Sequence, residues 1–289
     1  MSRVRRPLVA LACLFLAVGC SRISLVYDNA PFLTGVYVDH QLDLDPQQLR
    51  GWKPVLQTVQ ERHRREALPE LVALLERLLQ ATATGPARSD LACLMAAAAP
   101  VYRHHAELFI TAAAPLLAAL TPPQRTRLEQ RWHERETERG APPDAARERQ
   151  RRARRYIRNI SDWTGPLTPE QQQLIGEITA AMPHSQPALD AYRAAQRRRL
   201  MTLLEEGAGE RRIAAFLRAW LTDFDAMPIE LRRDGERLTE QLVTLAARLG
   251  ASLAPEQRAR VQHRLGELRD TLRRLQRGHT TPRPLPCSS

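Results

Sequence analysis

The apolar residues of this chain follow helical spacing from about Asp45 to Arg277, and this pattern constrains the fold more than any other feature. Within residues 209–225 they recur at steps of three and one, which places them on one stripe of a helix. Residues 68–80 repeat the pattern. No stretch of the sequence shows the alternation of period two that a half-buried strand requires. The sequence therefore predicts an all-α protein, an elongated multi-helix bundle built from helical hairpins.

Two later segments carry leucine at heptad-like spacing. The first runs from Leu231 to Leu249, the second runs from Val261 to Leu275, and the short segment 250–253 separates them. Each segment gains an apolar stripe from this spacing. Because a short connection usually joins antiparallel neighbours, we expect the two segments to form an antiparallel helical hairpin.

A short helix-start motif occurs at residues 44–48, 120–124, 167–171 and 253–257. An Asp or Thr can cap the helix with its side-chain oxygen, and the Pro that follows needs no backbone N–H in the first turn. The closing Gln, three residues after the cap, can complete a capping box. Ala254 stands at the cap position of the fourth copy and cannot accept a hydrogen bond there.

The copies of this motif are 76, 47 and 86 residues apart. The long, short, long order favours an internal duplication, with one unit at residues 44–140 and another at 167–277. The alternative is that a good helix start simply recurs in an all-helical chain. We predict a tether at residues 20–43, an N-terminal helical unit at 44–164, a C-terminal helical unit at 165–277 and a disordered tail at 278–289.

The beginning of the chain has the pattern of a secretory leader. Three arginines precede an apolar run from Leu8 to Val18, which is shorter than the roughly 20 residues that span a bilayer as a helix. The ending Leu16–Cys20 resembles a bacterial lipobox, which implies a signal peptide at residues 1–19 and fatty acids on Cys20. Ser21, in place of Asp, implies the periplasmic face of the outer membrane. The alternative is an ordinary secreted protein whose leader ends near a cysteine.

Two further cysteines, Cys93 and Cys287, remain for disulfide chemistry. The periplasm is oxidising, so a Cys93–Cys287 bond is allowed, but the sequence does not show that the two residues come close enough. Two separate thiols are the alternative.

The formal net charge of +11 is another constraint on partners. Outside the cytoplasm the basic balance points away from nucleic acid and toward anionic lipid, lipopolysaccharide phosphate or acidic polypeptides. Guanidinium groups bind such anions bidentately. The candidate anion-binding residues are Arg147, Arg151, Arg152, Arg154, Arg155 and Arg158. The alternative is a solvated helix whose charge nearby glutamates offset.

No residue pattern in the sequence assembles a catalytic site. It contains no phosphate-binding glycine loop, nucleophile elbow or HExxH metal motif. His104 and His105 are adjacent, so on a helix they point about 100° apart, which does not favour a shared metal. We therefore predict a protein that is not an enzyme and has no cofactor and no metal.

Two resemblances to known families add to these expectations. Segments 19–30, 44–48 and 63–69 resemble a family of uncharacterised Gram-negative lipoproteins, which implies an envelope location and a helical fold. The helix-start motif is similar to the LTxxQ motif of Spy/CpxP-like periplasmic proteins, which bind unfolded clients or a sensor kinase. We expect a non-enzymatic binding or scaffold role, in a chaperone-like version for unfolded or acidic polypeptides. The alternative is an envelope module that binds anionic lipid or lipopolysaccharide, and an envelope hydrolase is a third hypothesis.

Overall fold

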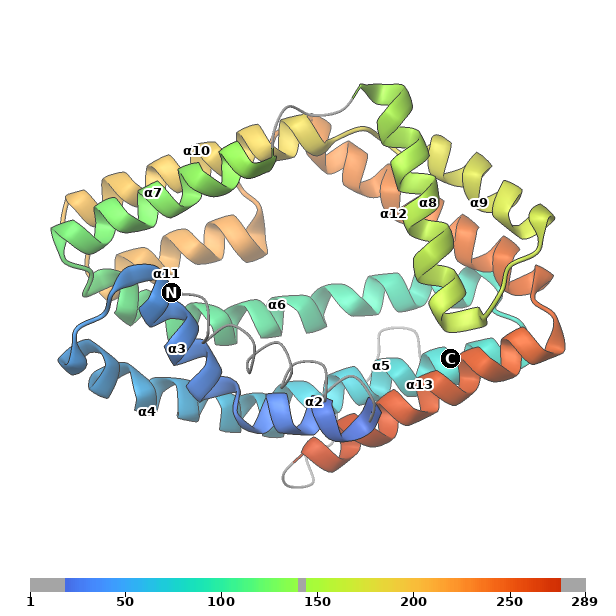
Figure 1. The fold of residues 1–289 in the computed structure, drawn as a ribbon, viewed down its shortest axis with the longest axis horizontal. Helices are drawn as coiled ribbons and strands as arrows, with labels where there is room; N and C mark the ends of the chain where they lie inside the picture. Colours follow the sequence, from blue (N-terminus) through green and yellow to red (C-terminus); the bar gives the residue numbers. More distant parts are fainter. Residues whose placement is uncertain (1–18, 140–143, 277–289) are drawn as a thin grey trace, which may run out of the picture.

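The computed structural model describes residues 19–139 and 144–276, and every regular element within these ranges is a helix (Figure 1). This confirms the predicted all-α class. The predicted tail at 278–289 and nearly all of the predicted signal peptide lie outside the described residues. In chain order the elements are α2 (Gly19–Asp28), α3 (Ala30–Leu42), α4 (Pro46–Arg62), the π-helical turn η1 (His63–Ala67), α5 (Leu68–Thr84), α6 (Arg88–Ala118), α7 (Pro122–Arg139), α8 (Ala145–Thr164), α9 (Pro169–Ala180), α10 (Gln186–Glu205), α11 (Glu210–Arg218), the π-helical turn η2 (Ala219–Asp223), α12 (Ile229–Ser252) and α13 (Pro255–Leu275).

Two buried apolar clusters hold the described helices together. The larger cluster joins α4, α6, α10 and α11 through residues such as Trp52, Ile110 and Ile213. The smaller cluster joins α9 to α12 and is centred on Ile175, which is fully buried. The helical stripe predicted in residues 209–225 supplies the larger cluster, because Ile213 and Leu217 both point into it.

The predicted antiparallel hairpin of residues 231–275 is wrong. α12 packs against α6 and α9, whereas α13 packs along α5 and against α8. Figure 1 shows α12 and α13 diverging from the turn that joins them. Both helices do carry the predicted apolar stripes, but the stripe of α13 faces α5, and the stripe of α12 faces α9 as well as α6. The spacing of the leucines determines which side of each helix is apolar, but it does not determine which other helix packs against that side.

The same contacts join the two predicted helical units. Although residues 145–164 are predicted to belong to the first unit, α8 packs on α9 and α13. The α5–α13 and α6–α12 contacts also cross the predicted boundary. Residues 44–164 and 165–277 therefore share one set of packed helices.

Most of the predicted tether at residues 20–43 is helical, in α2 and α3. Pro31 lies in the first turn of α3, where a proline costs no hydrogen bond. The hydrogen bond from the Leu33 amide to the Asn29 carbonyl, 2.9 Å, belongs to the start of α3. The chain thus begins as two helices in sequence, α2 and α3, that lie along the body.

The four helix-start motifs meet in two pairs. In the first pair the Gln48 side-chain amide donates to the Ala119 carbonyl at 2.8 Å and to Gln124 Oε1 at 2.9 Å. Gln124 donates in return to the Asp43 carbonyl at 2.9 Å and to Gln48 Oε1 at 2.7 Å. The N-termini of α4 and α7 are joined in this way.

The second pair repeats this geometry. Gln171 donates to the Ser252 carbonyl and Gln257 donates to the Pro166 carbonyl, while the two side-chain amides also bond to each other at 2.9 and 3.0 Å. In both pairs each glutamine reaches the carbonyl five residues before its partner. This equivalence supports an internal duplication. The glutamines also fill the capping role predicted for them, since their Oε1 atoms accept from backbone amides such as Thr168 N.

Candidate functional site

An apolar cavity of about 470 Å³ lies where α5, α6, α12 and α13 meet. Small-molecule sites in proteins usually occupy about 300–1000 Å³, so this volume suffices for a ligand. Every side chain that lines the cavity belongs to Leu, Met, Ala or Val. The lining residues are Leu71, Leu74, Leu75, Leu78, Leu91, Leu94, Met95, Ala98, Leu242, Val243, Ala246, Leu268 and Leu272.

The cavity follows from the divergence of α12 and α13. Their stripes contribute Leu242 and Leu268, but the two helices separate and do not close on each other. Most of the lining leucines, such as Leu75 and Leu272, remain half-buried. A half-buried leucine leaves part of its apolar surface in contact with water, so it stabilises the fold less than a fully buried leucine does. An apolar guest would complete this part of the core.

The leucine stripe of residues 68–80 and the stripes of α12 and α13 are predicted from the sequence, but the cavity between them is not. One signal in the sequence bears on it. Leu74 and Leu75 widen the stripe of α5 beyond what one packed neighbour covers. Such a wide stripe indicates that a helix faces more than one apolar surface.

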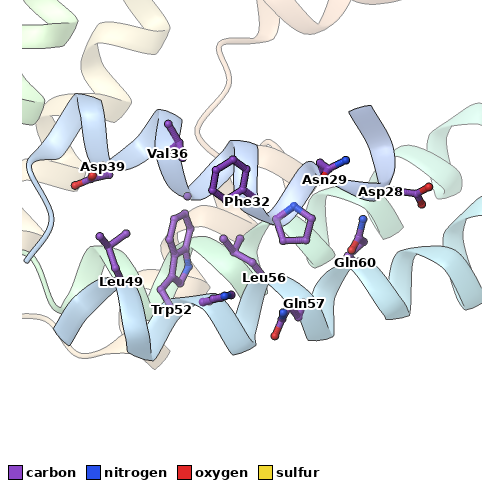
Figure 2. Close-up of a pocket in the computed structure, with 13 residues that line it drawn as sticks. Asp28, Asn29, Phe32, Val36, Asp39, Leu49, Trp52, Leu56, Gln57 and Gln60 are labelled. Carbon is purple, nitrogen blue, oxygen red and sulfur yellow. The ribbon is translucent and has the colours of Figure 1, made fainter. Parts of the chain in front are cut away.

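A second pocket of about 360 Å³ lies between α3 and α4. Figure 2 shows Phe32 and Val36 of α3 on one side, opposite Leu49, Trp52 and Leu56 of α4. The Trp52 indole N–H donates to the Ala112 carbonyl at 2.7 Å, which fixes the ring as the floor of the pocket. Polar groups, among them those of Asp28 and Gln60, also line it.

A polar cluster at η1 ties α2 to the body. The Tyr27 hydroxyl and His63 Nδ1 are 2.6 Å apart, and the Arg64 guanidinium donates to Asp28 at 2.6 Å while it covers the Tyr27 ring. Burial, with the nearby His105, lowers the pKa of His63 to about 4. Burial likewise raises the pKa of Tyr27 to about 12. Both side chains are therefore neutral at pH 7.

The histidines of this region do not form a metal site in the described ranges. His104 Nδ1 lies 3.0 Å from Glu70 and its Nε2 lies 3.6 Å from Glu66. His105 Nδ1 hydrogen-bonds to the Val101 carbonyl at 2.8 Å, one turn earlier on α6. His104 therefore joins α6 to α5 and η1, whereas His105 bonds within α6, and the two rings face different neighbours, as their adjacency predicts.

The candidate anion-binding arginines lie on α8, and the structure separates one of them from the rest. Arg152 is buried, and its guanidinium donates to the carbonyls of Met182 at 2.8 Å and Thr179 at 3.4 Å. It donates to one carbonyl in the last turn of α9 and to one just after the helix, so its assignment to an anion site is wrong. The remaining five candidates, Arg147, Arg151, Arg154, Arg155 and Arg158, are exposed.

Acidic neighbours accompany some of these exposed arginines. Arg147 lies 3.3 Å from Asp144, and Arg155 lies 4.0 Å from Glu148. These two ion pairs fit the alternative of a solvated helix with offset charge, and anion binding by the exposed arginines stays a prediction.

The predicted lipidation and disulfide residues are only partly described. Cys20 lies in the first turn of α2, and its side chain is outside the description. Cys93 is half-buried on α6 and is disulfide-bonded. Cys287 lies outside the described residues, so its pairing with Cys93 stays a prediction. Within the described ranges, no helix combines the length and the apolar character that crossing a membrane requires.

The fold and the cavity together define an all-α protein in which four helices, drawn from both halves of the chain, surround an apolar space. The chain belongs to the family of unknown function DUF6279, whose model matches residues 40–224. The match begins near the end of α3 and stops at Phe224, so α5 and α6 fall within it and α12 and α13 fall after it. No curated protein and no solved structure matches the chain.

Proposed function

We propose that this protein is a lipoprotein of the bacterial envelope that binds the hydrocarbon chain of a lipid and performs no chemistry on it. The observation that carries the proposal is the apolar cavity, whose lining offers Leu, Met, Ala and Val side chains and no nucleophile, acid or base. Catalysis needs an oriented set of reactive groups, whereas burial of a hydrocarbon needs only apolar surface.

The chemistry of the cavity favours a hydrocarbon chain over a polypeptide. An extended peptide brings a backbone N–H and C=O with every residue, and each costs free energy if it is buried without a partner. The side chains that line the cavity cannot accept or donate to them. An acyl chain has no such groups. The chaperone-like version of the binding role, with unfolded or acidic polypeptides as partners and with similarity to LTxxQ proteins, is therefore less well supported than lipid binding.

The location in this proposal rests on the sequence. The leader at residues 1–19 and the lipobox ending at Cys20 favour acylation of Cys20 and attachment to the periplasmic face of the outer membrane. The remaining chain keeps a positive net charge without the three arginines of the leader, which favours anionic lipid or lipopolysaccharide over neutral lipid as the source of the chain. Mass spectrometry of the protein from cells tests the anchor, since a bare Cys20 thiol would refute it.

The binding role is tested by filling the cavity. Ala98 lines the cavity on α6, and Ala99 next to it is exposed and does not line it. The probe is a fluorescent hexadecanoic acid, displaced by unlabelled palmitate below its micelle concentration, on residues 20–289 carrying Cys20→Ser. Ala98→Phe should weaken binding by about tenfold, which corresponds to ~1.4 kcal/mol. Ala99→Phe is the matched control and should bind as the parent does.

Three results of this experiment would contradict the proposal. They are absence of probe binding to the parent chain, equal binding by parent and Ala98→Phe, and an equal loss in Ala99→Phe. Thermal unfolding of each variant accompanies the titration. Because Ala98→Phe fills space that is empty, it should not lower the unfolding temperature, and retained stability with lost binding identifies the cavity as the site.

A further inference from the structure

Exposed apolar side chains concentrate on α2 and α3. Of the thirteen large apolar side chains that are prominently exposed in the described ranges, seven lie between residues 23 and 37, with exposures of 43–67%. They are Ile23, Leu25, Val26, Phe32, Leu33, Val36 and Tyr37. A folded protein rarely leaves such a group uncovered unless another surface binds it.

The spacing of these residues places them on one side of the helices. Six of the seven form three adjacent pairs, Leu25–Val26, Phe32–Leu33 and Val36–Tyr37, whose first members are seven and then four residues apart. Steps of seven and four return to the same helical face. In Figure 2 the α3 members Phe32 and Val36 stand beside the opening of the second pocket.

The opposite side of α2 and α3 packs against the body. The less exposed residues of this segment follow the same helical rhythm; they include Tyr27, Pro31, Gly35, Val38 and Leu42. The Tyr27–His63 and Asp28–Arg64 contacts hold α2, and Arg135 of α7 donates to the hydroxyl of Tyr37, a member of the exposed group, at 2.7 Å. The orientation of α2 and α3 is therefore fixed by polar contacts to η1 and α7.

The carboxylates nearest to the outer apolar side are engaged within the protein. Asp28 is paired with Arg64 and Asp39 accepts from the Leu44 amide at 3.0 Å, whereas Asn29 and His40 share the helical positions of the apolar residues. An interfacial helix that lies on a membrane needs an apolar face without negative charge, since anionic headgroups repel acids. Phe32 and Tyr37 add the aromatic rings that favour the boundary between headgroups and acyl chains.

We infer that the outer apolar side of α2 and α3 lies in the surface of a lipid bilayer. Cys20 precedes Ile23 by three residues in the same helix, a rise of about 4.5 Å along the axis. Acyl chains on Cys20, as the proposed function has them, would enter the bilayer at the start of this apolar side. The anchor would then not be a loose tether, and the body would take a fixed orientation to the membrane.

The test uses a chain without acyl groups, so that binding reports the helical face and not the anchor. Residues 20–289 with Cys20→Ser are mixed with vesicles of phosphatidylethanolamine and phosphatidylglycerol and recovered by flotation. We expect the chain to bind, and Leu25→Glu/Leu33→Glu to reduce the bound fraction by about tenfold, because two apolar contacts are replaced by charges that face anionic lipid.

The matched control is Phe109→Glu/Ile229→Glu, which makes the same change of charge at two exposed apolar positions on α6 and α12. This control should bind vesicles within about twofold of the parent, because surface substitutions away from the contact have small effects. Circular dichroism checks that both doubles keep their helices. Leu25→Glu/Leu33→Glu should also keep palmitate binding in the cavity, which separates this inference from the proposed function.

Three outcomes would overturn the inference. One is absence of vesicle binding by the parent chain, and another is an equal loss in both double variants. The third is a dimer of the parent in sedimentation without vesicles that Leu25→Glu/Leu33→Glu converts to monomer, since the apolar side would then be covered by a second copy of the chain.

Discussion

Removal of one glutamine from the second motif pair should destabilise the protein strongly. Gln171 is 4% exposed and its side chain makes four hydrogen bonds, to Thr168 N, the Ser252 carbonyl and, twice, the Gln257 amide. Gln171→Met keeps the length of the side chain and loses all four. A buried polar group without a partner costs about 1–3 kcal/mol. With two backbone groups and part of the Gln257 amide left unpaired, we expect a loss of about 3 kcal/mol.

The double variant gives the sharper test. Gln171→Met/Gln257→Met removes both side-chain amides, so no buried amide remains without its hydrogen-bond partner. The loss in unfolding free energy should therefore be smaller than the sum of the two single losses by about 1–2 kcal/mol. The measurement is denaturation in guanidinium chloride followed by tryptophan fluorescence and circular dichroism, with the slope required to stay constant.

Gln173→Met is the matched control, because Gln173 is exposed on the same helix and bonds only to Glu177 among the contacts found for it in the described residues. It should change stability by less than about 0.5 kcal/mol. Strictly additive losses in the double variant, or a Gln171→Met loss as small as that of Gln173→Met, would refute the pairing argument. The same cycle at Gln48 and Gln124 should give a smaller loss, since Gln48 is only half-buried.

Three further predictions follow from single contacts. Arg152→Met should lower stability by about 2 kcal/mol because it removes the side-chain donor to the carbonyl of buried Met182, just after α9. Arg151→Met, at an exposed neighbour, should be nearly neutral in the same denaturation assay, and equal effects would refute the capping role. The pKa of His63 falls from 6.5 to about 4 on folding, so between these pH values the unfolded chain binds a proton that the folded chain does not bind. Stability should therefore fall as the pH drops from 6.5 to 4. His63→Gln should flatten this part of the profile of unfolding free energy against pH, His133→Gln should not, and an unchanged slope in His63→Gln would contradict the assignment. Peptide mapping without reductant should find Cys93 joined to Cys287, and a Cys93 peptide joined to any other thiol would contradict that pairing.

Much of the secondary structure could be predicted from the sequence because helix formation is decided locally. The caps at Asp45 and Thr168 form as expected, and the side chains accept from backbone amides two or three residues later. The sequence did not predict helices at α2 and α3, because the residues on the inner side of these helices give a weak helical signal. They include Gly35, which is a poor helix residue, and contacts from α4 and α7 compensate for it.

The candidate site could not be predicted in the same way. A leucine stripe predicts that one side of a helix will be buried, but the positions of Leu242 and Leu268 in the sequence do not indicate which helices they will contact. The partner is chosen by packing across the whole chain, and α5 and α6 are more than a hundred residues away from them. Arg152 shows the same limit, because its neighbours in the sequence are exposed arginines and its role depends on the end of α9.

The sequence by itself determined the helical class and the positions of four helix starts, since each depends on residues within one or two turns of each other. Only the tertiary structure decided that the four closing glutamines meet in two equivalent pairs, that α12 and α13 separate, and that a cavity lined by carbon remains between four helices. These features depend on contacts between residues 76 to about 200 positions apart, where the free energy of packing, and no local preference, selects the partner.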